Sequence, residues 1–346
     1  MHAASTVTVA QLERFLTSSR AHKRSDQEIA EKLSRVDLSE ELTSTSLARI
    51  VAESSPGPDT AQQLEILAAA STLQPPPASE LPAIPTPDQT TQNRILAIAR
   101  ENAQHSLHIL PDLLALRETQ SFNNLPLGAI KRHQRPRIEM RFAGETRREI
   151  AVRKGREVGT AATEQTASLP SGLSTWGEFG AMLTVIFRDS SDASMQWNRW
   201  QTSDSGTQLA VFAYKVPRLD SHYTIDFCCY RESQDDPTDH SFRDQPGYHG
   251  EIFIDPATGE IARITLNAEL SDSDPVSRSA IAVQYGHVMI GGRSYLCPVG
   301  GVAVSELYNP DMQKDYGIAV ERHVNKVAFT HYHKFGSTAR ILTGVN

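Results

Sequence analysis

The sequence predicts an α+β protein in which a small N-terminal helical bundle precedes a large, curved antiparallel β-sheet. Three observations predict this class. Apolar residues recur at helical spacing over residues 1–74, and residues 75–87 hold six prolines. From about residue 113 onward, apolar and polar residues alternate, which is typical of half-buried strands.

Four short helices are expected in the first 74 residues. Ser25 and Glu28 form a capping box at the start of the second helix. Either Asp37 or Ser39 is expected to cap the third, and the fourth is expected at about 60–73. The apolar positions are, helix by helix, Val9, Leu12, Phe15 and Leu16; Ile29, Leu33 and Val36; Leu42, Leu47, Ile50 and Val51; and Leu64, Leu67 and Ala68. We interpret this bundle as an interaction or spacer module.

The prolines that follow form a stiff, extended linker. After it, Asp88 precedes a longer helix, which Pro111 ends. We therefore divide the chain into a helical module (1–74), a proline-rich linker (75–87) and a β-rich domain (88–346).

The β-rich domain is expected to contain about ten short strands separated by turns. Turn residues stand at Gly144-Glu145 and at 255–259, each between two alternating segments. Residues 173–187 keep helical spacing and are expected to form a helix across the sheet. The predicted architecture is an open half-barrel with one or two helices packed on it.

Composition and the absence of known motifs argue against several classes of function. The chain has 34 Lys and Arg against 41 Asp and Glu, and a net charge of -7 argues against nucleic acid as a partner. No apolar run approaches the ~18–20 residues of a membrane span. We find no nucleophile elbow, zinc-protease motif, phosphate loop or dinucleotide fingerprint. We expect no cofactor, and we favour a non-enzymatic protein while leaving an enzyme open.

The three cysteines are too few for a disulfide scaffold. Cys228 and Cys229 are adjacent, and neighbouring strand residues face opposite ways. At most one of them could therefore bridge to Cys297 on a nearby strand. A disulfide among these residues would suit an oxidising compartment, and three buried thiols are the alternative.

His331 and His333 stand two residues apart on a predicted strand and should face the same side. This spacing suits two metal ligands, but a metal site needs a third or fourth ligand. We interpret them as surface histidines and predict no metal.

Residues 131–157 carry ten Lys or Arg against four Glu, a local charge of +6. Such a hairpin could contact an anionic surface, including lipid headgroups at the membrane periphery. The alternative is the polar face of an antiparallel pair, with arginines opposite glutamates. The candidate contact residues are Arg137, Arg141, Arg147 and Arg148.

Aromatic residues concentrate in the middle of the β-rich domain. They could line a ligand cavity, and a filled core is the alternative. The candidate cavity residues are Trp176, Trp197, Phe212 and Tyr214.

Three segments carry a resemblance: Val7–Leu12, the Tyr248–Ile261 hairpin and Phe329–Ser337. Together they resemble a family of uncharacterised secreted proteins from soil bacteria. The order of a helix followed by many antiparallel strands, over about residues 90–335, is also similar to periplasmic lipoprotein-carrier and sigma-factor-regulator half-barrels. That resemblance implies a curved sheet around a helix, with an apolar cavity for acyl chains.

We therefore predict a secreted or periplasmic, non-enzymatic protein that binds an acyl or other apolar ligand, or an envelope protein, in a half-barrel cavity. The first residues lack a complete signal peptide, so we expect a leader that was removed or a missed start. A cytoplasmic protein is the alternative. The alternative functions are an envelope scaffold with a filled core and a hydrolase acting on envelope material. A cavity larger than a few hundred cubic ångströms would favour binding.

Overall fold

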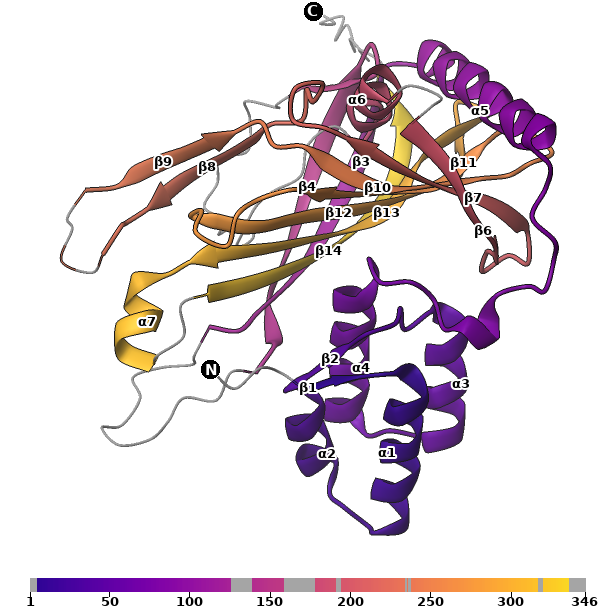
Figure 1. Cartoon of the computed structure of the whole chain (residues 1–346). Coiled ribbons are helices and arrows are strands. Elements are labelled where there is room, and N and C mark those ends of the chain that lie inside the picture. Colours follow the sequence, from indigo (N-terminus) through magenta and orange to yellow (C-terminus); the bar gives the residue numbers. More distant parts are fainter. Residues whose placement is uncertain are drawn as a thin grey trace, which may run out of the picture.

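A computed structural model describes residues 5–125, 139–158, 178–190, 194–233, 235, 238–316 and 320–335. The α+β class is confirmed: a cluster of helices is followed by a large antiparallel sheet that stays open (Figure 1). Trp176, Arg137 and residues 173–177 of the predicted helix lie outside the described residues.

The helical module contains the four predicted helices and two short strands that pair in parallel. The third helix differs from the prediction, because Thr43 caps it and accepts a hydrogen bond from the Ser46 amide. Asp37 instead lies in a strand that pairs with the N-terminal strand, and the Ser39 amide donates a hydrogen bond to the Val7 carbonyl. The elements are β1 (Ser5–Val7), α1 (Val9–Ala21), α2 (Asp26–Leu33), β2 (Val36–Leu38), α3 (Ser44–Ser54) and α4 (Pro58–Ser71).

Two capping interactions explain where helices begin in this module. The Ser25–Glu28 capping box at α2 is confirmed. At α4, Gly57 offers no side-chain cap, and Pro58 occupies the first turn. The Asp26 carboxylate accepts hydrogen bonds from the amides of Asp59 (2.9 Å) and Thr60 (3.2 Å), and these bonds lower the pKa of Asp26 against the opposing effect of burial. The start of α2 therefore caps α4.

The sheet has ten strands in the order β5-β4-β3-β14-β13-β12-β11-β10-β7-β6, and every neighbouring pair is antiparallel. A separate hairpin of β8 and β9 projects from it (Figure 1). The sheet strands are β3 (Leu113–Asn123), β4 (Arg141–Arg153), β5 (Arg156–Val158), β6 (Met195–Thr202), β7 (Gln208–Val216), β10 (Tyr248–Ile254), β11 (Ile261–Ala268), β12 (Val276–Ile290), β13 (Arg293–Tyr308) and β14 (Val320–Lys334), and the hairpin strands are β8 (Ile225–Tyr230) and β9 (His240–Asp244).

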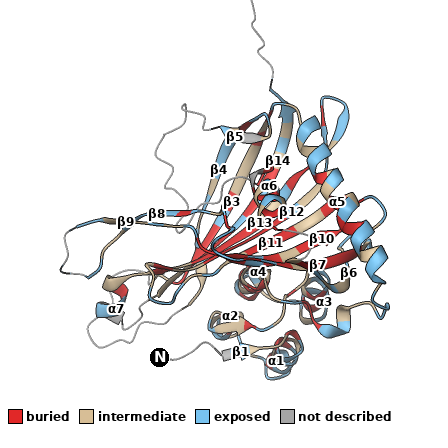
Figure 2. Ribbon diagram, turned by 45° about the horizontal axis from the view of Figure 1, so that its top comes forward, coloured by how far each residue is buried: buried red, intermediate tan, exposed pale blue. Residues whose placement is uncertain are grey.

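Helices cover both faces of the sheet. On one face, α5 (Gln89–Ile109) and α6 (Ala181–Asp189) pack on the main core, which includes Phe212, Tyr214 and Tyr248. On the other face, Ile66 and Ala69 of α4 pack against strand residues such as Val302 and Val324. The helical module thus lies beneath the sheet, with α5 and α6 above it (Figures 1 and 2). The short helices η1 (Ala78–Glu80) and α7 (Pro310–Tyr316) complete the described elements.

Candidate ligand-binding cleft

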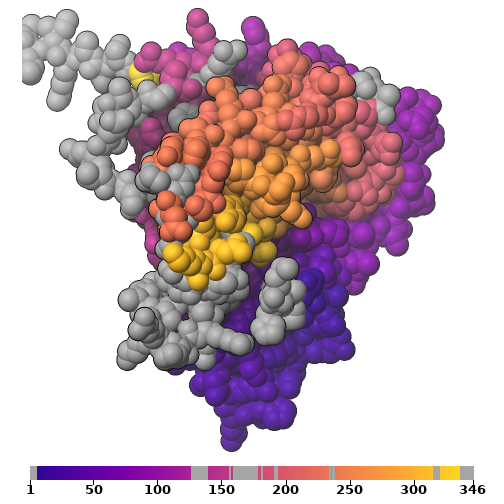
Figure 3. Space-filling model, turned by 60° about the vertical axis from the view of Figure 1, so that its left-hand side comes forward, coloured from indigo at the N-terminus to yellow at the C-terminus, as the bar shows by residue number. Residues whose placement is uncertain are grey.

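A cleft of about 730 Å³ lies between the helical module and the sheet. Its floor crosses seven neighbouring strands, β6, β7, β10, β11, β12, β13 and β14. Its roof comes from residues 41–47 and from α4, and the β6–β7 turn at 202–207 closes one end, where Ser44 hydrogen-bonds Asp204. In space-filling form, the module stands as a separate lobe against the sheet (Figure 3).

Small residues line part of the floor of this cleft, so few side chains protrude there from the sheet. These small residues include Ala262 of β11, Ala282 and Gly286 of β12, Gly300 of β13 and Ala328 of β14. A Cβ atom added to Gly300 would lie 3.3 Å from the Val327 carbonyl oxygen, a tight contact, so the neighbouring strand β14 approaches this glycine closely. Glycine inside a strand commonly marks a close approach by another backbone or a ligand.

Arg263 of β11 joins the floor to the roof. Its guanidinium lies 2.8 Å from the Glu41 carboxylate, donates a hydrogen bond to the Thr72 carbonyl, and lies 5.0 Å from the centre of the Phe253 ring. Both side chains of the pair are nearly buried, at 11% exposed for Arg263 and 12% for Glu41. Burial raises the pKa of Glu41, and the Arg263 charge only partly opposes this effect.

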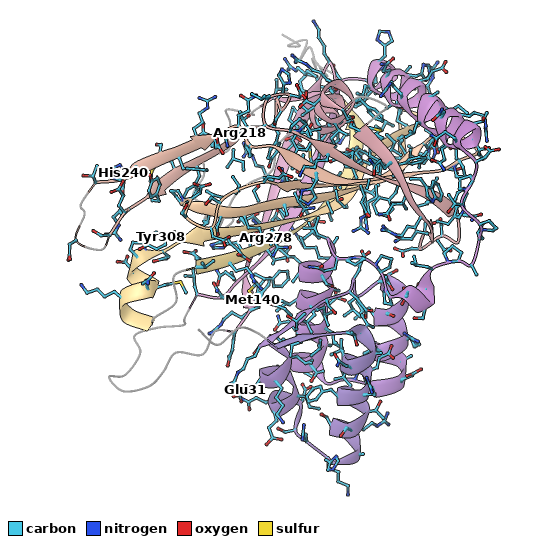
Figure 4. All side chains as sticks on the ribbon, viewed as in Figure 1. Glu31, Met140, Arg218, His240, Arg278 and Tyr308 are labelled. Carbon is cyan, nitrogen blue, oxygen red and sulfur yellow. A yellow bond between two sulfur atoms is a disulfide. The ribbon has the colours of Figure 1, made fainter. Side chains whose placement is uncertain are left out.

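Two further ion pairs and one amide contact hold the module to the sheet. Arg322 lies 2.8 Å from Asp37, and Lys326 lies 3.0 Å from Glu65. The Gln63 side chain donates to the carbonyl of Met140, which Figure 4 labels where the sheet meets the module. The cleft is therefore bounded by fixed contacts on several sides.

The three predicted cavity aromatics that the structure describes, Trp197, Phe212 and Tyr214, lie on the opposite face of the sheet from the cleft. Phe212 and Tyr214 are buried in the core under α5 and α6, and Trp197 packs against that core with its ring 5.4 Å from Phe212. Their neighbours Val211 and Phe253 form a small cluster on the cleft side, because consecutive strand residues face opposite ways. The cleft therefore uses a different set of residues from the one predicted.

The predicted surface arginines lie on β4, except for Arg137. Arg147 lies 3.0 Å from both Glu118 and Glu145, the arrangement expected of a polar strand face. Arg148 is exposed, and Arg141 is half-buried. A contact between this strand and an anionic surface stays a prediction.

The structure joins Cys228 to Cys229 and leaves Cys297 as a buried thiol. In this structure neither member of the pair bridges to Cys297, and only Cys297 is a buried thiol. The joined cysteines are exposed on β8, in the hairpin whose other strand begins at His240 (Figure 4). Cys297 packs in the core with Phe329 and Leu113, far along the sheet from that hairpin.

This arrangement predicts a difference in thiol reactivity. After mild reduction, we expect iodoacetamide to modify Cys228 and Cys229 in the folded protein and to leave Cys297 unmodified. Burial raises the pKa of Cys297 to about 12, so the reactive thiolate is scarce at neutral pH. Peptide mass mapping checks this result, with denatured protein as the control in which all three cysteines react. Equal modification of Cys297 in the folded state would contradict it.

The two candidate histidines lie at the surface, as the sequence predicts. His331 and His333 are both exposed near the end of β14, where a register shift interrupts pairing with β3, and the Nδ1 of His333 contacts the His331 carbonyl at 2.9 Å. Within the part of the chain that the structure describes, no group of three or more His, Cys, Asp or Glu residues could hold a metal ion. In the same residues, no helix is both long and apolar enough to cross a membrane.

Comparison with known proteins adds little. No protein-family model matches the chain, and no curated protein matches it. Among solved structures, the chain is similar to one chain of the complex structure of Pseudomonas aeruginosa MucA/MucB, with 9% sequence identity over 72% of this chain and 99% of that chain. The TM-score is 0.18, so this likeness carries no argument here. The resemblance to periplasmic half-barrels stays a prediction.

Proposed function

We propose that this protein is a secreted or periplasmic, non-enzymatic binding protein that holds an extended polypeptide segment in the cleft between the helical module and the sheet. The cleft volume of about 730 Å³ is the observation that carries the proposal. Ligand sites in proteins typically have volumes of about 300–1,000 Å³. The exposed Cys228–Cys229 disulfide supports an oxidising compartment.

The shape of the cleft supports an extended ligand. Its floor crosses seven strands, and neighbouring strands lie about 4.8 Å apart, which gives a length of about 29 Å. An extended polypeptide covers that length with about nine residues. The alanines and glycines of the floor leave room for a backbone to lie close to the sheet.

The lining disfavours the acyl ligand that the half-barrel resemblance implies. Hydroxyl, amide and carboxylate groups line the cleft beside the apolar floor, among them Thr43, Thr72, Gln201 and Gln284. An acyl chain would displace water from these polar groups without offering hydrogen bonds in return, which costs free energy, whereas a peptide backbone supplies both donors and acceptors. An acyl ligand is therefore the alternative occupant.

Ala328→Trp tests the site. Ala328 is exposed on β14 inside the cleft, so an indole at this position would fill the floor without replacing a core residue. Ala143→Trp is the matched control, because Ala143 is also an exposed strand residue and lies on β4, outside the cleft lining. The probe is a phage-displayed library of random peptides of about twelve residues, longer than the floor requires.

We expect selection on the wild-type protein to yield peptides that also bind Ala143→Trp and lose at least about tenfold in affinity for Ala328→Trp, or about 1.4 kcal/mol. Circular dichroism of both variants checks that they fold. Peptides that bind all three proteins equally, or a library that yields none, would overturn the proposal. Co-purified lipid that Ala328→Trp displaces would instead support the acyl alternative.

A further inference from the structure

We infer that the segment bound in the cleft is cationic, rich in lysine and arginine. This inference rests on the proposed function and concerns the charge of the ligand. It follows from the ionisable side chains that line the cleft, six of which are carboxylates and two of which are permanent cations. The carboxylates are Glu41, Glu65, Glu80, Asp204, Asp255 and Glu260, and the cations are Arg263 and Lys326.

Both cations already have carboxylate partners. Arg263 pairs with Glu41 at 2.8 Å, and Lys326 pairs with Glu65 at 3.0 Å. A ligand carboxylate or phosphate would therefore have to displace a carboxylate of the protein itself. An anionic ligand is disfavoured on this ground.

The other four carboxylates hydrogen-bond to groups other than lysine or arginine. Glu80 accepts hydrogen bonds from the hydroxyls of Thr43 and Ser46, and Asp204 accepts one from Ser44. Asp255 accepts from the amides of its own turn, at Ala257 and Thr258, and Glu260 lies 3.1 Å from the imidazole of His287. With His287 neutral, the cleft lining carries a net charge of -4, from six carboxylates and two cations.

Two of these carboxylates, Asp204 and Asp255, lie at one end of the cleft. Asp204 lies in the β6–β7 turn, and Asp255 lies in the β10–β11 turn. Strands β7 and β10 pair directly, with Ile254 opposite Ala210, so both turns leave the sheet at the same edge. A ligand entering at this end meets negative charge before it reaches the small-residue floor. Partly enclosed walls of one charge attract and orient ligands of the opposite charge.

The peptide library tests the charge of the ligand separately from peptide binding itself. If the inference holds, peptides whose binding depends on Ala328 will contain an excess of Lys and Arg over Asp and Glu. Peptides without that excess would overturn the inference and leave the proposed function standing. If no peptide depends on Ala328, the proposed function itself fails.

Charge variants give the second test. Asp204→Asn/Glu260→Gln removes two carboxylates while keeping oxygen acceptors for Ser44 and His287. We expect a selected basic peptide to lose about five- to tenfold in affinity, and less in high salt, because exposed and partly exposed charge pairs contribute modestly. Glu101→Gln/Asp272→Asn is the control, since it changes the net charge equally at exposed positions outside the cleft lining. An equal loss in both double variants would show a general charge effect and overturn the inference.

Discussion

Phe212→Ala is expected to lower the free energy of unfolding by about 3–5 kcal/mol. Phe212 is 1% exposed and lies at the centre of the core between the sheet and the helices α5 and α6. It contacts the Trp197 ring edge-on at 5.4 Å, and it pairs across the sheet with Ile252. Alanine would leave a cavity that close-packed strands cannot fill. Guanidinium unfolding followed by circular dichroism measures the change.

Phe142→Ala is the matched control. Phe142 is 41% exposed, and its ring packs edge-on against Phe122. Its loss should cost no more than about 1.5 kcal/mol. The folded Phe212→Ala protein should also bind the selected peptides as the wild type does, because Phe212 faces away from the cleft. A stable Phe212→Ala protein that has lost peptide binding would instead place the ligand on the α5–α6 face, as the sequence prediction has it.

Arg263→Met is expected to lower the free energy of unfolding by about 3–5 kcal/mol. The substitution leaves the nearly buried Glu41 carboxylate without its cation and the Thr72 carbonyl without its donor. A buried charge without a partner is costly, and the raised pKa of Glu41 already reflects that cost. Denaturant unfolding at neutral pH measures the loss.

A double variant tests whether the loss of stability comes from the unpaired Glu41 charge. Glu41→Leu/Arg263→Met removes both charges together and should recover most of the lost stability, because apolar replacement of a buried ion pair is often neutral or stabilising. Lys326→Met is the comparison at an exposed ion pair, because the side chains of Lys326 and Glu65 are both about half exposed. Breaking this pair should lower the free energy of unfolding by about 1 kcal/mol or less. If Arg263→Met cost no more than Lys326→Met, the Arg263–Glu41 pair would not hold the module to the sheet.

Local patterns predicted most of the fold. The capping box at Ser25 and the alternating residues of β4 depend only on residues close in sequence, so they can be recognised without tertiary information. The third helix was misplaced because Asp37 and Ser39 are good caps in isolation, while tertiary pairing with β1 draws this segment into a strand.

The cleft could not be predicted in the same way. Glu41 and Arg263 are separated by 222 residues and meet only because the helical module folds back beneath the sheet. One local signal was available: Gly286, Gly300 and Gly301 interrupt strands that are otherwise well formed, which commonly marks a close approach. The aromatic residues do not identify the cleft, since large aromatic side chains fill cores as readily as they line cavities.

The position of β14 has a consequence for how the molecule is made. This strand lies between β3 and β13, so it connects the two halves of the sheet, although it is the last strand that the structure describes. It also carries Arg322 and Lys326, which contact the helical module across as many as 285 residues of sequence. During synthesis the module can fold early, since its own core is local, but the sheet stays in two pieces until β14 is released. The cleft is therefore completed only after β14 has been synthesised, and a nascent chain that lacks this strand has no finished site with which to capture a ligand.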